Sequence, residues 1–178
     1  FQPFFKMSRD AAAPYLAAGK WKTFDSDREL VAGISSVDTH GHTPGHASNH
    51  LCFLMERDRL LFAGDHVMDG STVVISPPDG DMGAYLASIQ RLLDHTPALR
   101  TIAPAHGHLI EDPKAKLTEY LEHRLEREAQ VLAALRATGA AGGGTAALVE
   151  AIYTDVPEVL HPVARRSVWS HLRKLAED

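Results

Sequence analysis

The chain has 178 residues, of which 44% are hydrophobic and 23% are charged. These proportions are typical of a folded globular protein and exclude the disordered, collagen-like and coiled-coil classes. The formal net charge of −5 leaves no overall basic excess, so binding to nucleic acid would have to be local. The sequence contains no apolar run of about 18 residues, and its single cysteine, Cys52, cannot form an intrachain disulfide. We therefore expect a soluble cytoplasmic protein with no membrane partner.

Short β-rich runs precede a series of amphipathic helices. We expect a short helix within residues 5–18, strands at 34–38, 51–55 and 60–63, a helix at 83–95, a strand at 101–103, and helices at 113–137, 145–153 and 162–176. Because the acidic Asp112 followed by a proline is a typical helix start, a boundary near this point predicts two units, residues 1–111 and 112–178.

Leucines in the helix at 113–137 form an apolar stripe. We expect Leu117, Leu121 and Leu125 to pack against the last helix through its own apolar side chains at helical spacing. Those side chains are Trp169, Leu172 and Leu175.

Histidines and one aspartate follow three predicted turns or strand ends. A Thr43-Pro-Gly turn presents His46, the strand at 60–63 leads to Asp65, and the strand at 101–103 leads to His106. Taken singly, a loop histidine is usually a solvated side chain and an aspartate after glycine is usually a turn residue. Together, imidazole and carboxylate at three such positions favour a site for Zn²⁺ or a similar divalent transition metal.

The motifs resemble those of a known family. Thr43-Pro-Gly-His46, Phe62-Ala-Gly-Asp65 and Pro104-Ala-His106-Gly are similar to the last three metal-binding motifs of the metallo-β-lactamase-fold hydrolases, although Ala105 replaces a common glycine. The resemblance implies one or two zinc ions at one end of an αββα sandwich. It makes His46 and His106 metal ligands and Asp65 a bridging ligand that also orients the attacking hydroxide.

The family's first metal motif, His-x-His-x-Asp-His, is missing. Pro44 and Gly45 stand where its Asp and His would be. The expected fold is therefore α/β: the C-terminal half of an αββα metallo-β-lactamase sandwich followed by a small helical, winged-helix-like domain. We expect His42, His66 or His108 to supply additional metal or substrate contacts, and a homodimer to cover the apolar sheet face.

Two segments of the chain resemble different branches of this family. Residues 112–178 resemble the winged-helix-like domain of the β-lactamase-like endoribonuclease subgroup, whereas residues 4–46 resemble the organophosphate-hydrolase and lactonase branch. A chimera joined near His40-Gly-His-Thr-Pro-Gly-His46 is one interpretation.

Three function classes follow from these observations. The first is a hydrolase that uses metal-bound hydroxide on a small-molecule ester, lactone or phosphoester, impaired or dependent on dimerisation because of the missing motif. The second is a nucleic-acid-binding or ribonuclease-related module, which would contact RNA through residues 162–176. The third is a non-catalytic metal-binding or structural fragment. The basic candidates of the second class are Arg165, Arg166, His171, Arg173 and Lys174.

Overall fold

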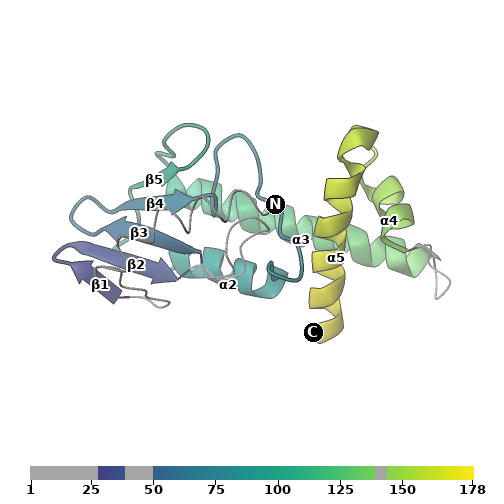
Figure 1. Ribbon diagram of the computed structural model, residues 1–178, viewed down its shortest axis with the longest axis horizontal. Helices are drawn as coiled ribbons and strands as arrows, with labels where there is room; N and C mark the ends of the chain where they lie inside the picture. The colour runs from purple at the N-terminus through teal and green to yellow at the C-terminus, as the bar shows by residue number, and fades with distance from the viewer. Residues whose placement is uncertain (1–27, 39–49, 139–143) are drawn as a thin grey trace, which may run out of the picture.

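The computed structural model describes residues 28–38, 50–138 and 144–178. A mixed five-stranded sheet occupies one end of the molecule (Figure 1). Its strands pair in chain order, with antiparallel neighbours up to β4 and a parallel pair between β4 and β5. The strands are β1 (Arg28–Val31), β2 (Ile34–Asp38), β3 (Leu51–Met55), β4 (Leu60–Gly64) and β5 (Thr101–Pro104).

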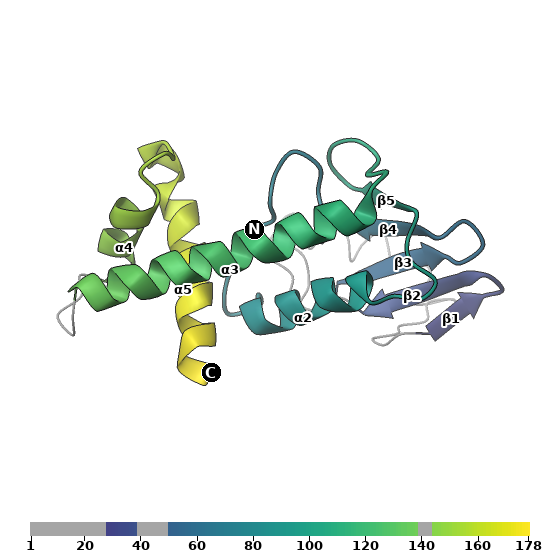
Figure 2. The same cartoon turned by 180° about the vertical axis from the view of Figure 1, so that it is seen from behind.

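Two helices cover one face of the sheet, and a helical unit lies beyond them (Figure 2). Helix α2 (Met82–Leu93) and the first part of α3 (Pro113–Thr138) lie against the strands, whereas the second part of α3 extends to the helical unit. That unit contains α4 (Gly144–Ile152), the 3₁₀ helix η2 (Glu158–Leu160) and α5 (His161–Glu177). Within the described residues, no helix is long and apolar enough to cross a membrane.

The predicted elements are confirmed wherever the structure describes them. The strands at 34–38 and 51–55 have these bounds, and the other two predicted strands are each longer by one residue. Asp112 caps α3, because its Oδ1 accepts the Ala115 N–H at 3.0 Å. Strand β1 was not predicted, because two of its four residues are the charged Arg28 and Glu29 and it therefore forms no apolar run. The helix predicted within residues 5–18 lies outside the described residues.

Buried and exposed side chains alternate along β3 and β4, and the buried ones form the first core. Cys52 and Leu61 are buried and pack with Tyr85 of α2, as the period of two along a strand requires. Phe53 and Phe62 point to the opposite face, where they are directly paired across β3 and β4 and are exposed. The sheet thus has one face covered by helices and one face that carries exposed aromatic rings.

Helix α3 contributes to both cores. Leu117 lies in the core under the sheet, whereas Val131 lies in a second core formed with α4 and α5. The prediction that Leu117, Leu121 and Leu125 pack against Trp169 is therefore wrong: Leu125 is exposed and Trp169 is 46% exposed. The reason is the length of α3: its 26 residues extend about 39 Å, so only its later turns reach α5. The last helix does bury apolar side chains in the second core, namely Leu172 and Leu175.

The division of the chain at residue 112 stays a prediction. Since α3 begins in the first core and ends in the second, the two units share one continuous helix.

Candidate metal centre

Asp65 and His106 meet at the end of the two parallel strands. Gly64 of β4 pairs with Pro104 of β5, and the Ala105 N–H donates to the Gly64 carbonyl at 2.8 Å. This pairing places Asp65 Oδ1 3.4 Å from His106 Nε2. Two of the three predicted metal ligands are therefore brought together by the sheet itself.

The separation of these two atoms fits a shared metal ion. In a tetrahedral site with bonds of about 2.0–2.1 Å, neighbouring donor atoms lie about 3.3–3.4 Å apart. Asp65 and His106 meet that spacing at 3.4 Å, and their side chains are 14% and 72% exposed. A mostly buried carboxylate beside an accessible imidazole leaves the site open on the His106 side.

The other predicted ligands lie elsewhere or outside the described residues. His46 and His42 belong to the segment that the structure does not describe. Across residues 28–38, 50–138 and 144–178, no group of three or more His, Cys, Asp or Glu side chains could hold a metal ion. The described part of the centre is thus a two-donor set, and the role of His46 stays a prediction.

His66, the residue after Asp65, is fully buried. Ser88 Oγ donates to the Tyr85 carbonyl at 2.6 Å and lies 2.8 Å from His66 Nε2, so the hydroxyl accepts from a protonated Nε2. The Tyr85 hydroxyl in turn donates to the His66 carbonyl at 3.0 Å. His66 was predicted to contact metal or substrate. The structure places it in the core, where it ties the residue after Asp65 to α2.

His50 was not singled out as a ligand, yet it lies against the end of β4. Gly64 has a φ of +54°, and a Cβ there would be 2.6 Å from His50 Nε2. The His50 ring also stacks on that of His66, with ring centroids 5.9 Å apart. Only glycine fits at position 64 without moving this imidazole.

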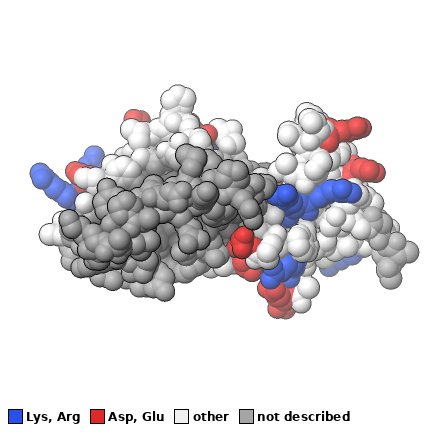
Figure 3. All heavy atoms as spheres, in the orientation of Figure 1, with Lys and Arg blue, Asp and Glu red and all other residues white. Residues whose placement is uncertain are grey.

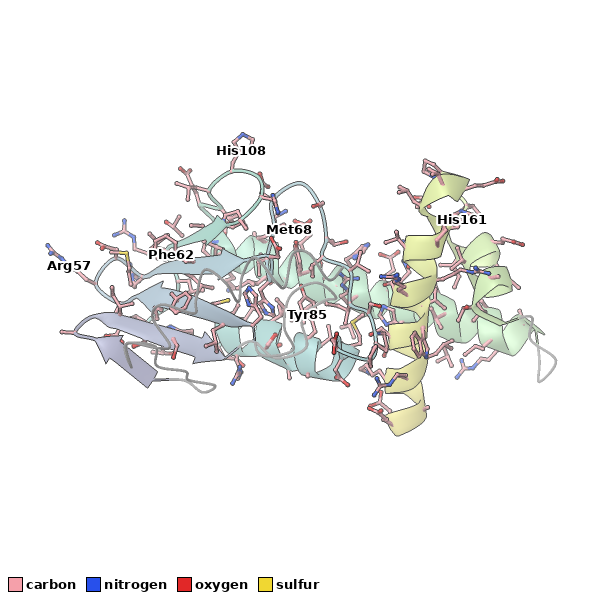
Figure 4. The ribbon with its side chains drawn as sticks, in the orientation of Figure 1. Arg57, Phe62, Met68, Tyr85, His108 and His161 are labelled. Carbon is pink, nitrogen blue, oxygen red and sulfur yellow. The ribbon has the colours of Figure 1, made fainter. Side chains whose placement is uncertain are left out.

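His108 pairs with Asp69 rather than with Asp65. Asp69 Oδ2 is 3.2 Å from both the backbone N and Nδ1 of His108, and these hydrogen bonds hold the pKa of Asp69 below its usual value. The Asp69 N–H donates to the His106 carbonyl at 3.3 Å. Figure 4 shows His108 at the outer tip of the loop after β5, beside the loop that carries Met68. The His106–His108 turn is therefore held by the neighbouring loop.

Helix α3 holds the loop that follows Asp65. The Tyr120 hydroxyl accepts the Met68 N–H at 3.0 Å and lies 2.7 Å from the Ser71 carbonyl oxygen, to which it donates. About one turn of helix later, Arg124 donates to the Val73 carbonyl. Burial raises the pKa of the Tyr120 hydroxyl, so it keeps its donor proton at neutral pH. Sequence reasoning missed both side chains, because neither lies in a motif.

The structure changes the basic face predicted on α5. His171 is fully buried and so does not face solvent, and Lys174 binds Glu128 at 2.9 Å and Asp178 at 2.6 Å. Figure 3 shows basic and acidic side chains interspersed over the helical part of the molecule. The Arg173 guanidinium lies 3.6 Å from the Glu177 carboxylate and is partly exposed. Contact with RNA stays a prediction that now depends on this residue and on the exposed Arg165 and Arg166.

Comparisons with known proteins identify the C-terminal part by its sequence. Residues 145–178 match the family model of the beta-lactamase associated winged helix domain. These residues comprise nearly all of α4 and the whole of α5, which agrees with the winged-helix-like unit expected from the sequence.

Two curated fungal relatives are similar over most of the chain. Lactamase-like protein adaB of Aspergillus niger is 39% identical over 147 residues, which covers 76% of this chain and 44% of that protein. Atrochrysone carboxyl ACP thioesterase of Aspergillus chevalieri is 37% identical over 143 residues, covering 77% of this chain and 44% of that protein. The chain thus spans less than half the length of these relatives.

A solved structure has the same fold. The crystal structure of a metallo-beta-lactamase family protein from Thermus thermophilus aligns with a TM-score of 0.65 at 18% sequence identity. The alignment covers 96% of this chain and 59% of that chain. The likeness therefore includes both the sheet part and the helical unit.

Proposed function

Because the chain belongs to the metallo-β-lactamase superfamily, we propose that it acts as a metal-dependent hydrolase of an ester or thioester. The single observation that carries this proposal is the 3.4 Å separation between Asp65 Oδ1 and His106 Nε2 at adjacent strand ends. The thioesterase name of one relative supports thioesters within the wider set of esters, lactones and phosphoesters that the motifs imply.

Asp65 and His106 would hold the metal, with His46 as a further ligand. Zinc suits a donor set of imidazole and carboxylate. When bound, the ion would lower the pKa of a water ligand and polarise the substrate carbonyl. The buried position of Asp65 keeps its carboxylate in one orientation, so it can direct the nucleophile. His106, being exposed, lies on the side from which the substrate arrives.

Asp69 and Gly107 hold the turn that carries His106. Asp69 holds the backbone on both sides of Gly107, directly after His106, because its N–H donates to the His106 carbonyl and its carboxylate accepts from the His108 N–H. Gly107 permits this contact, since it has a φ of +93° and a Cβ there would lie 2.6 Å from that of Asp69. We propose that this clamp sets the direction of the His106 imidazole.

The test measures metal content and hydrolysis together. The chain is loaded with zinc and assayed with a small thioester whose released thiol is followed by colour. We expect Asp65→Asn and His106→Ala each to lower bound zinc and to reduce hydrolysis by at least about 100-fold, since even outer-shell changes cost about 10–100-fold. His95→Ala is the control, because its Nδ1 lies 3.0 Å from the Pro97 carbonyl oxygen and it belongs neither to the metal pair nor to the clamp. Unchanged zinc content in both ligand variants would contradict the proposal.

Two further expectations stay predictions. A homodimer would cover the exposed sheet face that carries Phe53 and Phe62. A composite origin would place a junction near His40–His46, a segment outside the described residues.

A further inference from the structure

A cavity of about 310 Å³ lies between α3, the loop after β4 and the start of α5. This volume is at the lower end of the range for small-molecule sites. Most of its wall is apolar, with contributions from Val73 on the loop, Val156 before η2, and Leu160 and Val163 around the start of α5. Leu160 and Val163 are also exposed, so the cavity is open to solvent on this side.

One side of the cavity is cationic. His123, Arg124 and Arg127 all line it from a single face of α3, at the i, i+1 and i+4 positions. Among the described residues that line the cavity, none is Asp or Glu. In a chain with a net charge of −5, two arginines without a facing carboxylate form a local field that attracts anions.

Arg124 is a buried cation with unused donor capacity. It is 3% exposed, its Nη2 donates to the Val73 carbonyl, and its guanidinium lies 5.7 Å from the centroid of the Tyr85 ring. Its Nε is also buried and has no hydrogen-bond partner in the described part of the chain. A buried guanidinium N–H without an acceptor is costly. An anion entering the cavity would supply the missing acceptor.

Arg127 and His123, which line the cavity beside Arg124, would also interact with an anion bound there. The Arg127 guanidinium carbon lies 4.0 Å from the centroid of the Tyr153 ring, and Nη1 donates to Gln130 Oε1 at 2.9 Å. His123 Nδ1 is buried and makes no hydrogen bond within the described ranges. Burial, followed by the charges of the two arginines, lowers the pKa of His123, and a bound anion would oppose this effect.

We propose that this cavity binds a carboxylate that carries an apolar chain. The carboxylate meets Arg124 and Arg127, and the chain lies on the wall formed by Val156, Leu160 and Val163. The apolar lining distinguishes this ligand from a small inorganic anion, which would gain nothing from it. The site is separate from the pair Asp65 and His106 and goes beyond the proposed hydrolysis, because binding at this cavity requires no metal.

The first experiment compares four probes on the full, metal-free chain by calorimetric titration. Sodium octanoate has both charge and chain, octanamide has the chain alone, and acetate and inorganic phosphate have charge alone. We expect octanoate to bind at one site per chain, at least about tenfold more tightly than each of the other three. Octanamide lacks the charge-assisted contact, and acetate and phosphate lack the buried apolar chain, and each of these contributes at least about that factor. Octanamide binding as tightly as octanoate, or phosphate binding as tightly as octanoate, would overturn the proposal.

The second experiment locates the site. Arg127→Met removes the charge while keeping an unbranched side chain against Tyr153, and we expect it to weaken octanoate binding by about tenfold. Arg136→Met, on the same helix but outside the cavity, is the control and should bind like the unmodified chain. We also expect octanoate to raise the pKa of His123, followed by NMR of its ring. Equal octanoate binding by the two variants would contradict the assignment. The four-probe comparison does not depend on either variant folding.

Discussion

The sheet part and the helical part of the molecule position their polar groups in different ways. At the end of the sheet, Asp65 and His106 are placed by strand pairing and by the Ala105 N–H bond to Gly64. Between α3 and α5, a buried His171 lies 3.3 Å from Glu128, which also binds a lysine. The positions of the two candidate metal ligands therefore depend on backbone pairing. The contact between α3 and α5 depends instead on the charge states of side chains.

Gly64→Ala tests the backbone side of the comparison and should have the largest effect. A non-glycine residue at positive φ is strained, and the added Cβ would displace His50, so we expect a loss of about 3 kcal/mol in the free energy of unfolding. Urea denaturation measures it. Gly33→Ala is the matched control, because its φ is +80° with nothing within 4 Å of the added Cβ. Equal losses in the two variants would show that the His50 contact contributes nothing.

His171→Gln tests the ionisation side. Burial lowers the pKa of His171 from 6.5 to about 4, so the unfolded chain takes up this proton before the folded one does. The corresponding stability is present above pH 6.5 and is lost as the pH falls towards 4. Relative to the variant, the unmodified chain should lose on the order of 2 kcal/mol over this window.

The measurement for His171 is a series of denaturant titrations between these two pH values. Ser170→Ala, which changes a buried side chain of the same helix that is not ionisable, is the control and should keep the pH dependence of the unmodified chain. A pH dependence that His171→Gln leaves unaltered would mean that folding does not shift the pKa of His171.

Tyr120→Phe tests how α3 holds the loop that follows Asp65. It removes the hydroxyl that binds Met68 and Ser71 on the loop after Asp65. We expect a loss of about 1–2 kcal/mol in the free energy of unfolding, because partly buried backbone groups lose their partner. Faster amide hydrogen exchange at residues 68–71 should accompany it. Tyr153→Phe is the control, since no hydrogen bond of its hydroxyl is described. Unchanged exchange in Tyr120→Phe would contradict the role of this hydroxyl.

Phe62→Ser should have the smallest effect on stability, within about 1 kcal/mol, because the ring is on the exposed sheet face and loses only its cross-strand pairing with Phe53. Its expected effect is instead on assembly. If two copies cover this face, analytical ultracentrifugation should show a dimer for the unmodified chain and a shift to monomer for the variant. Val159→Ser, also at an exposed apolar position but in the helical part, is the control. A monomer at all concentrations would rule out the homodimer.

Much of the fold could be predicted because its signals are local. Short apolar runs on either side of a charged turn predicted β3 and β4, and the Asp112-Pro113 pair predicted the start of α3. The closeness of Asp65 and His106 was also predictable, since each follows a strand. The environment of His66 could not be predicted in this way, because the partners Tyr85 and Ser88 lie on a helix whose placement depends on the whole core.

Strands β2 to β5, the four α-helices of the described residues and the two donors that meet at the end of the sheet follow from the amino-acid sequence alone. Hydrophobic period and turn chemistry act between near neighbours, so they can be read along the chain. Three features instead depend on tertiary packing: Tyr120 holds Met68, Arg124 holds Val73, and α3 belongs to both cores. Tyr120 and Met68 are separated by 52 positions in the sequence, and Arg124 and Val73 by 51. Apolar spacing shows which side of a helix is buried but does not specify its partner.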